Sequence, residues 1–172
     1  MMVEVTVARI GLDSSTNSYV VILREKQGRR LLPIWIGQPE AESIVMQMNH
    51  EKRERPLTHD LCKALIVGLG GALRRVTITR VLKGTYYAEL HIDGPTGAVH
   101  VDARPSDSIA IALRLDAPIF APEELLSAFE DEPSSGDEDA PAAASAEQEL
   151  SADQLKAYLA NLRPEDFGKF TP

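Results

Sequence analysis

The sequence has one cysteine and few aromatic residues. Cys62 is the single cysteine among 172 residues, and Phe, Trp and Tyr together make up 5%. One thiol can form no intramolecular disulfide, and it cannot supply the repeated cysteines of a zinc finger. Because Cys62 lies within an apolar helical pattern, we expect a packed thiol in a reducing compartment rather than a reactive one.

Long apolar runs and several familiar motifs are also missing. No stretch approaches the ~20 apolar residues that span a bilayer, and the N-terminus has no pattern of signal type, so we expect a cytoplasmic protein. The sequence contains no Gly-x-Gly-x-x-Gly, no Gly-Lys-Ser/Thr loop and no Gly-x-Ser-x-Gly elbow, which excludes most nucleotide-dependent enzymes and serine hydrolases. The four histidines lack the i, i+4 spacing of helical zinc sites, so the sequence does not favour zinc. They are His50, His59, His91 and His100.

The net charge of −8 is concentrated at the C-terminal end. Residues 1–130 hold 15 Lys and Arg against 16 Asp and Glu, whereas residues 131–172 hold 3 against 10. A nearly neutral first part with local basic clusters, such as residues 52–55, remains compatible with a polyanionic partner. These clusters are equally compatible with solvated loop charges.

Apolar periodicity predicts an α+β fold. Period-2 alternation or short apolar runs predict strands near residues 3–8, 19–23, 31–36, 75–82, 86–92, 98–101 and 118–121. Pro33 places the third strand at an edge or a bulge. Helical spacing predicts helices over residues 39–48, from an N-cap at Thr58 through Leu61, Leu65 and Leu69, and over residues 105–115. We expect a largely antiparallel or mixed sheet with the helices packed on it.

Composition divides the chain into three parts. We expect residues 1–130 to form one domain and residues 131–150 to be an acidic disordered linker, because that stretch has almost no large apolar side chain. Residues 151–172 are predicted to form a short helix and a tail.

Two short polar runs carry the candidate chemistry. Residues 55–60 read RPLTHD and residues 102–107 read DARPSD, and each leads into a helix. Helix starts attract anions, which makes both runs candidate phosphate sites. Helix capping and dipole stabilisation select the same residues without any function.

The residue types in these runs suit metal-assisted phosphodiester hydrolysis. Carboxylates could hold Mg²⁺ or Mn²⁺, which take oxygen ligands. His59 could transfer a proton near neutral pH, and arginines could bind phosphate. The candidate catalytic residues are His59, Asp60, Asp102, Arg104 and Asp107. The candidate metal ligands are Asp102, Asp107 and Glu40, and the candidate substrate-binding residues are Arg55, Lys52 and Arg53.

The chain also resembles the bifunctional nuclease domain family. The resemblance rests on LPIWIG at residues 32–37, Glu40-Ala41, RPLTHDL at 55–61, TYYA at 85–88 and DARPSDSIA at 102–110. It covers roughly residues 3–130. It implies an α+β domain, homo-oligomeric assembly and nuclease activity on both DNA and RNA, without a settled set of catalytic residues.

The leading hypothesis is therefore a nuclease of low sequence specificity that acts on DNA and RNA and uses a divalent metal ion as its cofactor. The alternative is a non-catalytic oligomeric module that binds nucleic acid or protein, with the polar runs as structural corners. A weaker third possibility is a sensor of small anions at the helix starts.

Overall fold

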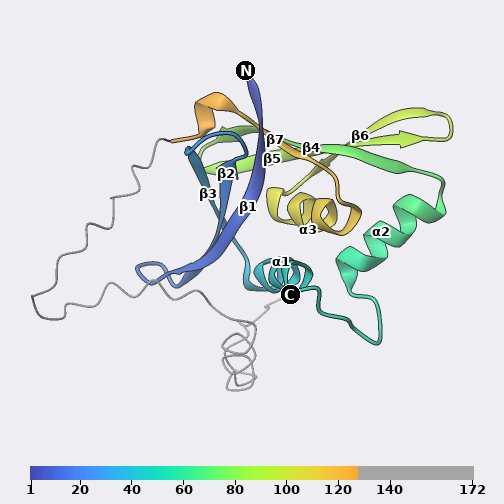
Figure 1. Ribbon diagram of the computed structural model, residues 1–172, viewed down its shortest axis with the longest axis horizontal. Coiled ribbons are helices and arrows are strands. Elements are labelled where there is room, and N and C mark those ends of the chain that lie inside the picture. Colours follow the sequence, from blue (N-terminus) through green and yellow to red (C-terminus); the bar gives the residue numbers. More distant parts are fainter. Residues whose placement is uncertain (128–172) are drawn as a thin grey trace, which may run out of the picture.

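A seven-stranded mixed sheet carries three helices on one side in residues 1–127, the part of the chain that the computed structural model describes (Figure 1). The α+β prediction is confirmed, and the expectations for residues 131–172 lie outside the described residues. None of the helices within residues 1–127 is long and apolar enough to cross a membrane. The elements in chain order are β1 (Met2–Asp13), β2 (Ser18–Glu25), β3 (Leu31–Ile36), α1 (Gln38–Met48), α2 (Thr58–Gly68), β4 (Ala72–Leu82), β5 (Thr85–Gly94), β6 (Gly97–Ala103), α3 (Pro105–Leu115), β7 (Ile119–Pro122) and a 3₁₀ turn (Glu123–Leu125).

The short strand β7 joins two antiparallel halves of the sheet. The strand order is β3-β2-β1-β7-β4-β5-β6, and β7 runs antiparallel to β1 and parallel to β4. Ile119 lies opposite Val5 of β1 on one side and opposite Val76 of β4 on the other. Pro33 lies in β3, which confirms its predicted edge position, because an edge strand leaves one side of its backbone unpaired.

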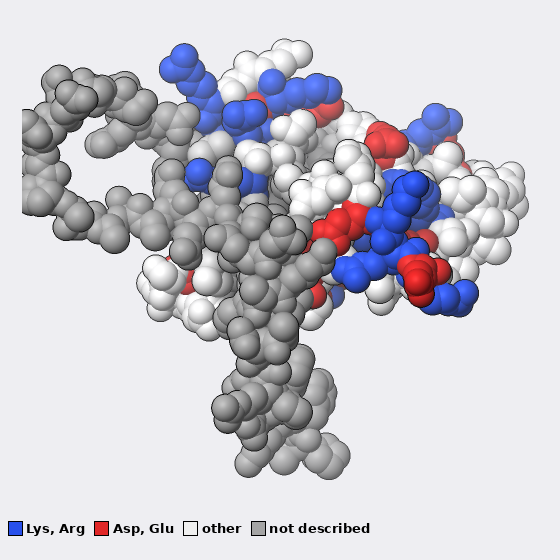
Figure 2. Space-filling model, turned by 60° about the horizontal axis from the view of Figure 1, so that its bottom comes forward, with Lys and Arg blue, Asp and Glu red and all other residues white. Residues whose placement is uncertain are grey.

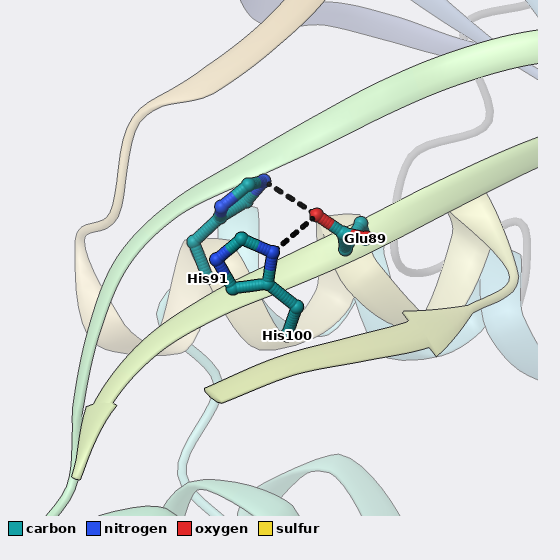
Figure 3. A group of neighbouring side chains, drawn as sticks. All are labelled: Glu89, His91 and His100. Carbon is teal, nitrogen blue, oxygen red and sulfur yellow. Dashed lines mark ion pairs between the residues drawn. The ribbon is translucent and has the colours of Figure 1, made fainter. Parts of the chain in front are cut away.

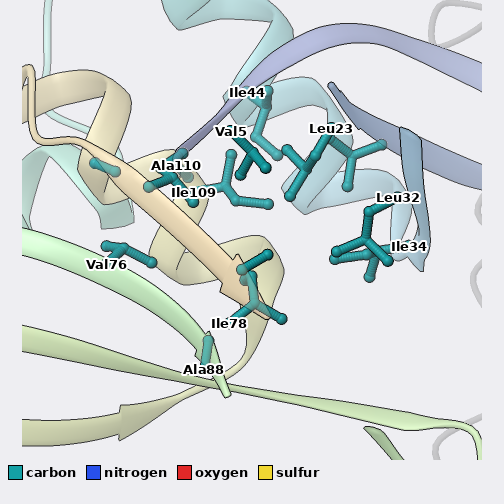
Figure 4. Close-up of a cluster of buried hydrophobic side chains, with 14 of the residues drawn as sticks. Val5, Leu23, Leu32, Ile34, Ile44, Val76, Ile78, Ala88, Ile109 and Ala110 are labelled. Carbon is teal, nitrogen blue, oxygen red and sulfur yellow. The ribbon is translucent and has the colours of Figure 1, made fainter. Parts of the chain in front are cut away.

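The core fills the space between the sheet and helices α1 and α3. Ile44 of α1 and Ile109 of α3 are fully buried, and they meet the inward side chains of strands from both halves of the sheet (Figure 4). Eight residues of α3 are buried, so this helix is the central element beneath the sheet. The strand residues in the cluster include Val5, Leu23, Leu32, Ile34, Val76, Ile78 and Ala88.

Helix α2 packs differently from the sequence prediction. Its leucines Leu61, Leu65 and Leu69 are 52%, 53% and 74% exposed, while Cys62 and Ile66 pack against the core. The predicted apolar stripe therefore faces outward, because a neighbouring stripe of the same helix contacts α3. We call Leu61, Leu65 and Leu69 the α2 leucine row.

The N-terminus of α2 also differs by one residue from the prediction. Leu57, and not Thr58, occupies the N-cap position, and Thr58 is the first helical residue. The Asp60 carboxylate accepts a hydrogen bond from the Leu57 backbone N–H at 2.9 Å. The Asp60 carboxylate thus satisfies the backbone donor of the N-cap residue, as the third helical residue does in a capping box.

Arg114 of α3 connects all three helices. Its side chain is 3% exposed, and its Nε donates to Asp60 Oδ1 of α2 at 2.6 Å. Other guanidinium nitrogens donate to the carbonyl of Ser43 in α1 at 3.3 Å and to the carbonyl of Ala110 in α3 at 2.9 Å. Burial raises the pKa of Asp60, but hydrogen bonds from Arg114 and the Leu57 N–H outweigh it and hold that pKa below its usual value.

We expect the Asp60→Ala substitution to destabilise the fold by about 3 kcal/mol, because the Arg114 charge would stay buried without a partner. The measurement is urea unfolding at neutral pH. Lys26→Ala, which removes an exposed ion pair with Glu4, is the control and should change stability by well under half as much. Equal effects of the two substitutions would show that Arg114 does not need Asp60.

Candidate functional site

His59 is held between a serine from α1 and an aspartate from α3. Its ring nitrogens lie 2.7 Å from Ser43 Oγ (Nδ1) and 2.9 Å from Asp107 Oδ1 (Nε2). His59 is 8% exposed and Ser43 is 6% exposed. A serine hydroxyl can donate to a bare imidazole nitrogen or accept from a protonated one, so Ser43 fixes the ring in either protonation state.

Arg104 connects Asp107 to the protein surface. Its Nε and Nη2 donate to the two oxygens of Asp107 at 2.7 and 3.1 Å, and Nη2 also donates to Glu40 at 2.7 Å. The Arg104 side chain is 66% exposed, whereas the side chain of Asp107 is 27% exposed. Burial raises the pKa of Asp107, but hydrogen bonds from Arg104 and His59 outweigh it and hold that pKa below its usual value. Asp107 is therefore an anion at neutral pH.

The starts of three helices bring these side chains together. Glu40 and Asp107 lie in the first turns of α1 and α3, and His59 lies at the start of α2. Both carboxylates benefit from the positive end of their helix, and Arg104 occupies the N-cap position of α3. We call Ser43, His59, Asp107, Arg104 and Glu40 the helix-start cluster. Sequence analysis predicted four of these five residues.

A hollow of about 310 Å³ opens beside Arg104. Two aromatic residues, Trp35 of β3 and Tyr86 of β5, line it together with Arg104. Trp35 is 52% exposed, and its indole N–H donates to Asp13 at 3.0 Å. Tyr86 is partly buried against the core, so the exposed Trp35 ring is the surface on which a base could stack, with Arg104 as the contact for a phosphate.

A second hollow, of about 440 Å³, lies along the connection between α1 and α2. The three predicted substrate-binding residues Arg55, Lys52 and Arg53 line it, together with Asp60 and Arg114. Acidic residues of the same connection also line it, so its charge is mixed. Figure 2 shows basic side chains in separate groups with acidic ones beside them, rather than one continuous basic surface.

Two predicted site residues lie apart from the helix-start cluster. Both Asp60 oxygens are engaged, one by Arg114 and the other by the Leu57 N–H. Asp102 is exposed on β6, directly opposite Glu89 of β5. The three predicted metal ligands Asp102, Asp107 and Glu40 therefore do not converge on one point, and Arg104 stands between the latter two.

The structure adds residues that sequence analysis did not select. Ser43 gave no signal, because a lone serine in a helix has no motif and only the packing of α1 on α3 brings it to His59. Trp35 and Tyr86 lie within the segments that carry the family resemblance, so their position there was a usable signal. A further group, Glu89, His91 and His100, comes together across the β5–β6 hairpin. The alternation of Glu89 and His91 along a strand is the sequence signal for this group, whereas helical spacing of the histidines does not reveal it.

The helix-start cluster combines three chemical capacities. An imidazole near neutral pH can exchange protons, a carboxylate beside it orients the ring, and an exposed guanidinium can hold an anion such as phosphate. Nε2 of His59 is on the side that faces Asp107 and the exposed Arg104. Asp107 thus contacts both the imidazole nitrogen and the anion-binding group.

The chain is similar to proteins of one known family. A family model of the bifunctional nuclease domain matches residues 21–133. The chain is 42% identical over 167 residues to the uncharacterized protein Rv1829 of Mycobacterium tuberculosis (strain ATCC 25618 / H37Rv), which covers 96% of this chain and 98% of that protein.

More distant relatives are plant proteins. The chain is 28% identical over 110 residues to bifunctional nuclease 1 of Oryza sativa subsp. japonica, across 62% of this chain and 33% of the plant protein. It is 29% identical over 110 residues to bifunctional nuclease 1 of Arabidopsis thaliana, across 62% of this chain and 34% of that protein. The family match spans most of the sheet, all three helices and every residue of the helix-start cluster, so the chain belongs to the bifunctional nuclease domain family.

Proposed function

We propose that this protein is a nuclease that hydrolyses phosphodiester bonds of DNA and RNA with low sequence specificity. Membership in the bifunctional nuclease domain family supports the reaction class. The observation that carries the proposal is the row His59–Asp107–Arg104, which links a buried imidazole to an exposed guanidinium through contacts of 2.7–3.1 Å. This row ends at a hollow that contains two aromatic side chains.

Each member of the row has a distinct role in the proposed reaction. Arg104 binds the scissile phosphate and stabilises the charge that develops on it. His59 would exchange a proton with the attacking water or the leaving oxygen at Nε2 once its contact with Asp107 opens, while Ser43 at Nδ1 keeps the ring in place. Asp107 orients both His59 and Arg104 and is thus a positioning residue.

The two hollows suit a single strand better than a duplex. The exposed Trp35 ring offers a face on which a base can stack regardless of sequence. Arg55, Lys52 and Arg53 supply positive charge for the phosphates that flank the scissile bond. Contacts to base faces and to phosphates, rather than to base edges, account for cleavage with low sequence specificity.

A divalent cation, Mg²⁺ or Mn²⁺, is part of this proposal. Such ions bind through one or two carboxylates together with substrate phosphates, and Asp107 and Glu40 supply two adjacent carboxylates. When bound, the ion would neutralise phosphate charge and activate water. Arg104, which now bridges these carboxylates, is exposed enough to turn toward the phosphate.

We also propose that the protein is a homo-oligomer, as expected from the family resemblance. The α2 leucine row presents three leucines that are more than half exposed on one helix stripe. Exposed apolar surface of this kind is typical of subunit contacts. A second copy of the chain is the occupant that this proposal assigns to the row.

Cleavage of short single-stranded DNA and RNA by the purified protein should depend on the helix-start cluster. We expect His59→Ala and Arg104→Ala each to lower kcat/KM by ~10²–10³, because one removes the proton-transfer group and the other removes a phosphate contact. His50→Ala and Arg29→Ala, at exposed positions outside the cluster, are the matched controls.

Full activity in both His59→Ala and Arg104→Ala would contradict the assignment and indicate a contaminating nuclease. Saturable binding of the oligonucleotide without turnover in the unmodified protein would instead support the non-catalytic module.

Chelation tests the divalent cation separately. We expect excess EDTA to lower the cleavage rate at least tenfold, and added Mg²⁺ or Mn²⁺ to restore it. An unchanged rate in EDTA would remove the metal from the proposal while leaving His59 and Arg104 in their roles.

Light scattering coupled to size exclusion tests the assembly. We expect a mass of at least two chains for the unmodified protein and a shift toward one chain in Leu65→Glu, because a charge in an apolar contact is costly to desolvate. Lys63→Glu, at an exposed polar position of the same helix, should leave the mass unchanged. A monomeric unmodified protein would refute this part of the proposal.

A further inference from the structure

Two histidines and a glutamate meet on the β5–β6 hairpin, away from the helix-start cluster. Glu89 Oε1 lies 3.1 Å from Nε2 of His91 and 3.1 Å from Nδ1 of His100 (Figure 3). One ligand atom from each of the three side chains lies within 4.8 Å of the other two. We call these residues the hairpin cluster. Within residues 1–127 it is the one group of at least three His, Cys, Asp or Glu side chains gathered this closely.

The hairpin register brings these residues to one face of the sheet. His91 of β5 lies opposite His100 of β6, and Glu89 of β5 lies opposite Asp102 of β6. Side chains two apart on a strand share a face. Ala88 and Leu90 point into the core on the helix side, so Glu89 and His91 point to the opposite face. The sheet therefore separates the hairpin cluster from the helix-start cluster.

One ring nitrogen of the hairpin cluster has no hydrogen-bond partner within residues 1–127. His91 Nε2 is buried and has no hydrogen-bond partner, although it lies close to the Glu89 carboxylate. A buried polar atom without a partner is uncommon in folded proteins and calls for an explanation such as a bound ion. The side chain of His100, by contrast, is 56% exposed, which leaves the cluster open to solvent on its β6 side.

We propose that Glu89, His91 and His100 bind one divalent transition-metal ion of the zinc class. Two imidazoles and one carboxylate are a common ligand set for such ions, and three protein ligands leave one position open. Ligand atoms in a tetrahedral zinc site lie ~3.4 Å apart, which is close to the two separations of 3.1 Å to the Glu89 oxygen. The ion would give the buried Nε2 of His91 the partner that it lacks.

The location of Asp102 extends the proposal. Asp102 lies opposite Glu89 on the same face, so it is a neighbouring carboxylate of the hairpin cluster. Sequence analysis chose Asp102 as a metal ligand together with Asp107 and Glu40, but the hairpin register associates it with histidines instead. Because the ion would connect β5 to β6, it would stabilise the outer end of the sheet independently of the proposed nuclease reaction.

The test is metal binding to the full chain without a histidine tag. Competition with a chromophoric chelator should show one Zn²⁺ per chain, and Co²⁺ should give the visible absorption of a four- or five-coordinate site. We expect His100→Ala to weaken Zn²⁺ binding at least tenfold, and the double variant His91→Ala/His100→Ala to weaken it at least a hundredfold. His50→Ala, an exposed histidine outside the cluster, should bind as tightly as the unmodified protein.

A second readout separates binding from folding defects. Zn²⁺ should raise the melting temperature of the unmodified protein and of His50→Ala, but not that of His100→Ala. Because the His100 side chain is largely exposed, its replacement should preserve the fold. His100→Ala therefore tests Zn²⁺ binding even if His91→Ala does not fold. Zn²⁺ affinity that is the same in the unmodified protein and in His100→Ala, or an absence of stoichiometric binding, would overturn the proposal. Neither outcome depends on cleavage of nucleic acid.

Discussion

The buried guanidinium of Arg114 is the constraint on which the arrangement of the helices depends. It binds Asp60 of α2, the Ser43 carbonyl of α1 and the Ala110 carbonyl of its own helix. Two of these partners adjoin or belong to the site, since Ser43 contacts His59 through its hydroxyl and Asp60 follows His59 in the chain. Because a buried charge must keep its partners, Arg114 fixes His59 between α1 and α3.

This arrangement separates the rigid part of the site from its accessible part. Ser43 and His59 are buried, Asp107 is partly buried, and Arg104 is exposed. The buried residues therefore hold the imidazole in place, and the exposed Arg104 is the residue that can contact an anion.

Local patterns predicted the elements well, and they predicted the contacts between elements poorly. Alternation and proline positions located the strands, including Pro33 at the edge. The pattern of α2 failed because Leu61, Leu65 and Leu69 form the more apolar stripe, yet the contact with α3 uses Cys62, Ile66 and the polar pair His59 and Asp60. The two polar runs did meet through His59 and Asp107, whereas the register of β6 took Asp102 to the other face of the sheet.

The proposed function requires nucleic acid to bind at the exposed end of the helix-start cluster. The most direct measurement is an NMR titration of isotope-labelled protein with a short single-stranded oligonucleotide that resists hydrolysis. We expect the largest shifts at the Arg104 Nε–H and the Trp35 indole N–H, and we expect both to follow one binding curve. Shifts confined to other surfaces, with these two resonances unchanged at saturation, would contradict it.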